Sequence, residues 1–287
     1  MAIISVFSRI NHMIKQEQIK TVAPTDKAEH EYWGSSAKYY DQAYEADTKL
    51  NDMPFYLDVA KSANGAVLEV GCGSGRLLIP TARAGVQIDG FDFSPDMLSI
   101  LRDKLNGEAP EVRDRVSLHQ GDMRDFSLGK KYSLITVPFR PLQHIFTVDD
   151  QLAAFNNFSE HLNRGGRLAF NLFYPDYKLL EETGVEHQEL EWKDKNDSTL
   201  TVRRSFVRTS VDKLNQVFQG EFIFRSFRGD SFVREDRSHL SMSYYTYPQV
   251  LLLLRASGFR VLEEYGSFNK EPISVCKEMV FIAEKEK

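Results

Sequence analysis

The segment from Val67 to Gly75, Val-Leu-Glu-Val-Gly-Cys-Gly-Ser-Gly, limits the folds open to this chain more than any other stretch. Its first four residues are aliphatic and β-branched enough for a buried strand, with Glu69 as the one charge among them. Glycines follow at positions 71, 73 and 75, and a helical pattern then covers 76–83. Glycine lets a backbone turn tightly and approach a ligand, and the start of a helix offers unpaired N–H donors. The segment therefore predicts a strand, a ligand-binding loop and a helix in succession.

The glycine spacing separates this loop from the dinucleotide-binding loop, which has a related pattern. The dinucleotide fingerprint G-x-G-x-x-G, counted from Gly71, needs a glycine at position 76, where this chain has Arg76. The pattern here is G-x-G-x-G instead. A nicotinamide-dependent oxidoreductase is therefore a distant alternative.

The rest of the chain alternates short aliphatic runs with longer amphipathic segments. Strands are expected at Ala66–Val70, Val86–Phe91, Val116–His119, Tyr132–Val137, Arg167–Phe173, Phe259–Glu264 and Glu278–Ala283. Helices are expected from Pro95 to about Leu105, at Asp149–Leu162 and at Pro248–Ser257. Strands that alternate with helices predict a doubly wound α/β fold with a mostly parallel sheet. Residues 186–246 alternate with period two, which predicts three or four antiparallel strands inserted after the fifth strand.

Two carboxylates follow the second and third predicted strands. Asp92 ends the second, where a carboxylate can accept hydrogen bonds from both hydroxyls of a ribose. Asp122, in Gln-Gly-Asp-Met, comes just past the third and can accept from an exocyclic amine, with the Met123 amide on the adjacent ring nitrogen. Ligands of open α/β sheets bind at the carboxyl ends of the strands. A nucleoside ligand is therefore expected there.

The segments VLEVGCGSG, GFDFSPDML and HQGDMRDF, in this order, closely resemble class I S-adenosylmethionine-dependent methyltransferases. The resemblance is specific over about residues 66–172 and implies a seven-stranded sheet that binds S-adenosylmethionine without a metal. It implies Gly71, Gly73 and Gly75 at the methionine portion, Asp92 at the ribose and Asp122 at the adenine. Glu69 would order the loop or reach the cofactor through water. The remaining cofactor contacts that it implies are Cys72, Phe93, Met97, Met123 and Pro138.

Candidates for the acceptor side follow the fourth predicted strand, in Pro-Phe-Arg-Pro-Leu-Gln-His from Pro138 to His144. The motif that DNA and protein-amide methyltransferases carry here is absent, and the segment resembles aminosugar and glycopeptide N-methyltransferases. His144, with an ordinary pKa of about 6.5, is a candidate general base, and the alternative is a loop histidine bonded to a carbonyl. Arg140 is a candidate for a substrate carboxylate or the cofactor, with a surface role as the alternative.

The segment Tyr39-Tyr40-Asp41-Gln42-Ala43-Tyr44 resembles the opening motif of the same small-molecule enzymes. There a tyrosine packs near the sulfonium, which cation–π attraction favours. Tyr40, and then Tyr44, are the candidates. Aromatic residues four positions apart are also common helix-packing pairs, so that alternative stays open.

These patterns divide the chain into three parts. Residues 1–64 are expected to form an N-terminal helical segment or cap, whose first turns (Ile3, Ile4, Phe7) have amphipathic spacing. Residues 65–184 and 247–287 are expected to form the cofactor-binding domain. Residues 185–246 are the antiparallel insertion, expected either to cover the substrate or to form a dimer contact.

Composition limits the partners of this chain. With 36 Lys and Arg against 41 Asp and Glu, its formal charge is −5, which disfavours a protein that grips a nucleic-acid backbone. No apolar run approaches the ~20 residues that span a bilayer. Two distant cysteines make neither a disulfide framework nor a zinc site, and a reducing cytoplasm fits best. A homodimer remains open.

The leading prediction is an enzyme that transfers a methyl group from S-adenosylmethionine to nitrogen or oxygen of a small molecule, leaving S-adenosylhomocysteine. A protein or RNA methyltransferase on the same fold is one alternative. A non-catalytic protein that binds S-adenosylmethionine is another.

Overall fold

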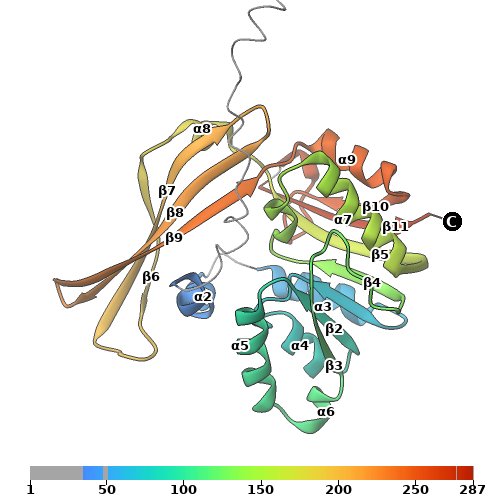
Figure 1. The fold of residues 1–287 in the computed structure, drawn as a ribbon, viewed down its shortest axis with the longest axis horizontal. Helices are drawn as coiled ribbons and strands as arrows, with labels where there is room; N and C mark the ends of the chain where they lie inside the picture. Colours follow the sequence, from blue (N-terminus) through green and yellow to red (C-terminus); the bar gives the residue numbers. More distant parts are fainter. Residues whose placement is uncertain (1–34, 48–50, 276, 287) are drawn as a thin grey trace, which may run out of the picture. The chain divides into compact units, whose positions relative to one another are not determined.

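The structure is a computed structural model that describes residues 35–47, 51–275 and 277–286. Its two sheets differ in kind: one has seven strands and is mostly parallel, and the other has four antiparallel strands (Figure 1). The amphipathic spacing predicted around Ile3, Ile4 and Phe7 lies outside the described residues.

The seven-stranded sheet has the strand order β10-β11-β5-β4-β1-β2-β3. Its strands are β1 (Val67–Val70), β2 (Ile88–Asp92), β3 (Val116–Gln120), β4 (Tyr132–Val137), β5 (Leu162–Phe173), β10 (Phe259–Tyr265) and β11 (Glu278–Lys285). Neighbours among the first five are parallel, and β11 runs antiparallel to both β5 and β10. The predicted fold class is confirmed.

Helices cover both faces of this sheet, which explains why its central strands are apolar throughout. One face packs against α3 (Asp52–Lys61), α4 (Leu78–Arg83), α5 (Pro95–Asn106) and α6 (Pro110–Arg113). The other packs against α7 (Val148–His161) and α9 (Tyr247–Ala256), which lie together in Figure 1. All four residues of β1 are buried, and β1 lies between β4 and β2, so the glycine loop follows an interior strand of the sheet.

The predicted helix starts agree with the structure where a capping residue marks them. Ser94 accepts a hydrogen bond from the amide of Met97 at the start of α5, and Pro95 occupies the first turn. Thr147 accepts from the amide of Asp150 at the start of α7. The helix after the glycine loop begins at Leu78 rather than at position 76, because the chain completes a turn first.

The four-stranded sheet joins β6 (Glu186–Lys193), β7 (Leu200–Asp212), β8 (Val217–Arg228) and β9 (Ser231–Ser243) in sequence order. It is inserted between β5 and α9, with the short helix α8 (Tyr177–Glu181) before it. The helix α2 (Ser35–Ala46) contacts β6 and β9. Two short 3-10 helices, η2 (Pro141–His144) and η3 (Ile273–Val275), complete the described elements.

Candidate active site

The candidate site lies at the carboxyl ends of β1, β2 and β4, where the direction of strand succession reverses at β1. Ligands of doubly wound sheets bind at such a reversal. The loop after β1 holds Gly71, Gly73 and Gly75 at φ values of 73°, 53° and 86°. Residues with a side chain rarely adopt these values, so the predicted glycine loop has a steric basis.

Asp92 is the polar residue that ties this loop to β2. Its carboxylate accepts a hydrogen bond of 2.7 Å from the amide of Gly73 and one of 2.9 Å from the amide of Ser94. Burial raises the pKa of Asp92, and these backbone hydrogen bonds oppose the rise. This carboxylate therefore joins the loop to the strand end, in addition to the hydrogen bonds that the amides of Gly71 and Cys72 donate to the Phe91 carbonyl at 2.8 and 3.1 Å.

Glu69 lies under the loop, on β1, with 3% of its surface exposed. Burial raises its pKa to about 8, and the positive charge of Arg76 partly offsets that rise. Arg76 itself donates to both oxygens of Asp52, at 2.8 and 2.5 Å, and Asp52 is 1% exposed. The site therefore contains a buried ion pair and, beside it, a buried carboxyl group that favours its neutral form.

Asp122 lies past the end of β3, next to the end of β2. Both of its oxygens accept from the Arg124 Nε at 2.9 Å. Burial acts to raise the pKa of Asp122, but the hydrogen bonds and the charge of Arg124 outweigh it and lower the pKa. Met123 is partly buried, and its carbonyl accepts from the Asn157 side chain at 3.2 Å. Asp122 is thus close to the other strand ends, as predicted, and held by a neighbouring guanidinium.

The other four predicted cofactor residues fall into two groups. Cys72, Met97 and Pro138 are buried, and burial raises the pKa of the Cys72 thiol. Cys72 packs in the core between the sheet and α3, α4 and α5. Phe93 is 41% exposed, at the end of β2. Among these four, Phe93 has the side chain surface that a ligand could cover.

Helix α2 brings Tyr40 and Tyr44 to the glycine loop. The two rings meet edge to face at 4.3 Å, and a Cβ placed on Gly73 would lie 3.6 Å from the Tyr40 hydroxyl. Asp41 accepts a hydrogen bond of 2.6 Å from Ser74 and pairs with Lys104 at 2.7 Å. The helix is therefore fastened directly to the loop.

The opposite side of α2 packs on the four-stranded sheet. Tyr39 is fully buried and stacks on Phe224 of β8 at 4.6 Å. The Gln42 side chain accepts from the Trp192 indole at 3.2 Å and from the Lys195 amide at 2.9 Å. One helix thus contacts both the glycine loop and the insertion.

The turn after β4 has an unusual backbone. Phe139 and Arg140 have φ values of 64° and 72°, a conformation that costs residues with side chains about 1–3 kcal/mol each. The buried Asn171 holds this turn, because its Oδ1 accepts from the Phe139 amide at 2.8 Å. The same oxygen also accepts from the Tyr56 hydroxyl. The Nδ2 of Asn171 donates to Glu278, which in turn forms an ion pair with Arg140. Arg140 is therefore tied into the protein rather than extended into solvent.

His144 ends η2 and lies against β9. Burial lowers its pKa to about 4, and a backbone hydrogen bond with Ser241 opposes that shift. The neighbouring Gln143 is fully buried. Its side-chain Nε2 donates to the Ser243 carbonyl at 2.8 Å, and its side-chain Oε1 accepts from the backbone N–H of Phe173 at 3.0 Å. These bonds join the β4 turn to the end of the insertion.

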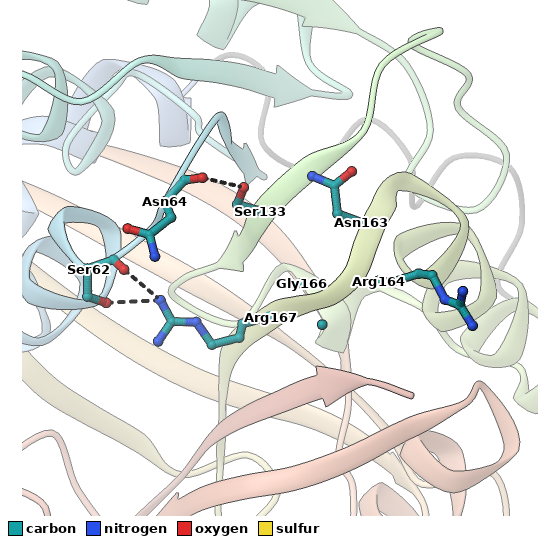
Figure 2. A pocket seen from close by; sticks show the side chains of 8 residues that line it. Ser62, Asn64, Ser133, Asn163, Arg164, Gly166 and Arg167 are labelled. Carbon is teal, nitrogen blue, oxygen red and sulfur yellow. Dashed lines mark hydrogen bonds between the residues drawn. The ribbon is translucent and has the colours of Figure 1, made fainter. Parts of the chain in front are cut away.

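Two surface hollows lie at the opposite edge of the sheet, at the amino ends of the strands. The first, of about 350 Å³, is lined by Ser62, Asn64, Ser133 and residues 163–167. Figure 2 shows Arg167 donating to Ser62, and Ser133 donating to the Asn64 carbonyl, across it. The second, of about 570 Å³, is lined by residues that flank the starts of β1 and β2. Neither hollow contains a residue of the candidate site.

Three residues of the site were not among the sequence predictions. Arg76 was noted only as the residue that breaks the dinucleotide pattern, although its place after the last loop glycine could have drawn attention. Asn171 and Gln143 carry no local signal, because the hydrogen-bond partners of their side chains lie 30 to 115 positions away in the chain. Within the described residues, no cluster of His, Cys, Asp and Glu could hold a metal ion, and no helix is long and apolar enough to cross a membrane.

Comparison with known proteins adds the family context. Residues 67–166 match the methyltransferase domain family. A 101-residue segment is 37% identical to dTDP-3-amino-3,4,6-trideoxy-alpha-D-glucopyranose N,N-dimethyltransferase of Streptomyces venezuelae, covering 35% of this chain and 39% of that protein. A 137-residue segment is 31% identical to dTDP-3-amino-3,6-dideoxy-alpha-D-glucopyranose N,N-dimethyltransferase of Streptomyces fradiae, covering 46% and 51%. The chain thus spans about half or less of these curated relatives.

The fold agrees over a longer stretch. The structure of CalS10, an amino pentose methyltransferase from Micromonospora echinaspora solved with S-adenosylmethionine, superposes with a TM-score of 0.67. It covers 86% of this chain and 96% of that one, at 23% identity. Residues 67–166 therefore resemble a methyltransferase domain, and the seven-stranded sheet has the same Rossmann-like fold as that solved methyltransferase.

Proposed function

We propose that this protein is an enzyme that transfers a methyl group from S-adenosylmethionine to nitrogen or oxygen of a small-molecule acceptor. The observation that carries the proposal is the hydrogen bond that the Gly73 amide donates to the Asp92 carboxylate, which fixes the glycine loop at the end of β2. The three loop glycines have the φ values of a backbone that a ligand can approach closely. The aminosugar relatives and the shared fold support it.

The residues at the strand ends suit the parts of the proposed donor. We assign its amino-acid portion to Gly71, Gly73 and Gly75, with the buried Glu69 beneath them, where a ligand cation would favour the charged carboxylate. Asp92 would accept from the ribose, and Asp122, with the Met123 amide, would contact the adenine. Tyr40, supported by Tyr44, would lie near the sulfonium over the loop, where a ring face attracts a cation. Phe93 would contact the base, while Cys72, Met97 and Pro138 would shape the wall from within the core.

The donor supplies an electrophilic methyl group, so the chain has to align an acceptor and exclude water. We place the acceptor at the turn after β4, beside Arg140 and His144. Neutral at physiological pH, His144 can accept a proton, but its pKa of about 4 makes it a weak base. We therefore propose that His144 contributes only modestly to the rate as a general base. Nitrogen is the favoured atom, because the relatives named above methylate amino groups.

Calorimetry on ligand-stripped protein tests the donor site. Both S-adenosylmethionine and S-adenosylhomocysteine should bind, and conversion of the first to the second with an aminosugar acceptor tests catalysis. No binding heat from either compound would sink the proposal. Binding without turnover across amine and hydroxyl acceptors would reassign the chain as a non-catalytic binding protein. A cytoplasmic location and a homodimer remain predictions.

A further inference from the structure

The arginines on the two faces of the four-stranded sheet differ in how their Nε atoms are hydrogen-bonded. On one face, called here the outer face, the Nε of Arg203, Arg225 and Arg237 each donates to a glutamate carboxylate at 2.7 to 2.8 Å. On the other, the inner face, α2 packs on one end and α8 on the other. There the buried Nε atoms of Arg204, Arg208 and Arg234 have no hydrogen-bond acceptor within the described part of the chain.

Two of the inner-face arginines form hydrogen bonds or ion pairs through their other guanidinium nitrogens. Arg208 donates to the carbonyls of Leu179 and Glu182, and so closes the end of α8. Arg234 donates to the Tyr39 hydroxyl at 3.1 Å and lies within 4 Å of two aspartates, Asp194 and Asp236. These contacts explain why both side chains are buried.

Arg204 lies between the regions where α2 and α8 pack, and it is less well satisfied. Its ion pair among the described residues is with Glu189, at 2.9 Å, and its side chain is 17% exposed. Its guanidinium lies 4.9 Å from the centre of the Phe222 ring. A buried donor without an acceptor is rare in proteins and calls for an explanation such as a ligand.

The surroundings of Arg204 connect it to the candidate active site. Burial raises the pKa of the Tyr44 hydroxyl, and the nearby positive charge of Arg204 opposes that rise. The centre of the Tyr44 ring lies 4.7 Å from that of Phe139, in the turn after β4. Phe206, two positions further along β7, continues the inner face, and a Cβ on Gly220 would lie 2.3 Å from its ring. Glycine at that position therefore leaves room for the Phe206 ring against the backbone of β8. The result is an aromatic surface beside the place proposed for the acceptor, with Arg204 over Phe222 and Arg208, whose guanidinium is bonded to the carbonyls at the end of α8, over Phe206.

We propose that Arg204 binds an oxyanion, a phosphate or carboxylate, on the methyl acceptor, with Phe222 and Phe206 as the apolar floor beside it. This inference rests on the proposed function and narrows it to acceptors that carry a negative group. A guanidinium offers several N–H donors in a planar fork, which suits such a group. Glu189 would then occupy the place of the anion in the absence of acceptor.

Calorimetry with two simple probes, inorganic pyrophosphate and malonate, tests the inference on full-length protein loaded with S-adenosylhomocysteine. Arg204→Gln should weaken binding of at least one probe by about tenfold, the usual size of a lost charged hydrogen bond. Arg203→Gln is the matched control, since it is the adjacent residue on the other face and should change binding less than twofold. Glu189→Gln should tighten binding, because the competing carboxylate is gone.

The outcomes separate this inference from the proposed function. Equal binding of both probes to the wild-type and Arg204→Gln proteins overturns the Arg204 site, even when S-adenosylhomocysteine binds normally. A wild-type protein that binds neither probe overturns it as well. Absence of S-adenosylhomocysteine binding counts against the proposed function instead, and the probes are then titrated into unloaded protein. Should Arg204→Gln fail to fold, Arg204→Lys, which keeps the charge but not the fork, together with Glu189→Gln, decides the matter. Unchanged binding in both variants overturns the site.

Discussion

The proposed donor half of the candidate site, at the glycine loop and the strand ends, and its proposed acceptor half, at the turn after β4, are built by different means. The donor half consists of glycine backbone and strand ends, and its main hydrogen bonds join residues within about two dozen positions, such as Gly73 and Asp92. The acceptor half is held by side chains from distant segments, as when Asn171 links the β4 turn to α3 and β11. A site built from backbone geometry over a short segment produces a recognisable sequence motif, whereas a network of side chains far apart in the sequence does not.

Replacing Asp92 should produce the largest effect and should fall on the donor half alone. Asp92→Asn removes one acceptor charge at the loop, so S-adenosylhomocysteine affinity should drop by up to about 100-fold, as for a lost hydrogen bond to a charged group. Asp96→Asn, an exposed change four residues away, is the control and should leave the affinity unchanged. Calorimetry measures both. Comparable losses in the two variants would contradict the assignment.

The two halves contact each other where Gly71 lies against Pro141, so a substitution at Gly71 should affect both. A Cβ on Gly71 would lie 2.4 Å from the Pro141 Cγ, while one on Gly85, also at positive φ, would meet nothing within 4 Å. Gly85→Ala should therefore cost only its backbone strain, about 1–2 kcal/mol. Gly71→Ala should cost clearly more and lower both donor affinity and turnover. Thermal unfolding and calorimetry compare them; equal melting temperatures would show that the contact is unimportant.

Asn171 tests the acceptor half by itself. Asn171→Leu removes the acceptor of the Phe139 amide, so the strained turn should relax and kcat should fall by about tenfold, the effect of roughly 1.4 kcal/mol. S-Adenosylhomocysteine affinity should stay within twofold. Tyr56→Phe, which removes another hydrogen bond to the same Asn171 oxygen, is the control and should spare kcat. A matching loss of donor affinity would show that Asn171 supports the whole site rather than the turn.

His144 should have a smaller effect, and its sign with pH is defined. Its pKa is about 4 in the folded protein and about 6.5 when unfolded, so the unfolded chain binds more protons between these values. Stability should therefore fall as pH drops from 6.5 towards 4, and His144→Gln should flatten that fall. Turnover at pH 7 should decrease by only about threefold, as expected of a weak base. The exposed His239→Gln is the control. A steep loss of donor affinity would place His144 in the donor half.

Glu69 should show the opposite dependence on pH. Its pKa is about 8 in the folded protein and about 4.3 unfolded, so the folded protein holds an extra proton between these values and loses stability as pH rises. Glu69→Gln should therefore melt about 10 °C above the wild type at pH 8 without ligand, and at the same temperature near pH 4. Scanning calorimetry at both pH values measures this difference. A constant difference at the two values would show that the carboxyl stays charged.

Sequence reasoning predicted most of the fold, and it located the residues that we propose for the donor half, because the signals of both are local. Aliphatic runs located the strands, and Ser94 with Pro95 located the start of α5. The glycines and the two aspartates at strand ends predicted which strands would meet. The parallel neighbours β1, β2 and β3 then placed them at one edge.

The acceptor half could not be read in the same way. The φ values of Phe139 and Arg140 are imposed by Asn171 and Glu278, and no residue preference near position 139 announces them. The pKa of His144 follows from its burial against β9, about 100 positions away. Arg204 is one of several arginines in an alternating strand, and only the pairing of β7 with its neighbours assigns its face.

Helix α2 has a consequence for anyone who would exchange parts between enzymes of this fold. Asp41 fastens it to the glycine loop, while Tyr39 and Gln42 fasten it to β6, β8 and β9 and the turn after β6. A foreign insertion grafted in place of residues 186–243 would leave those two side chains without their partners. Swapping the insertion to change the acceptor therefore requires transplanting Ser35–Ala46 as well, together with a match for Ser74 and Lys104.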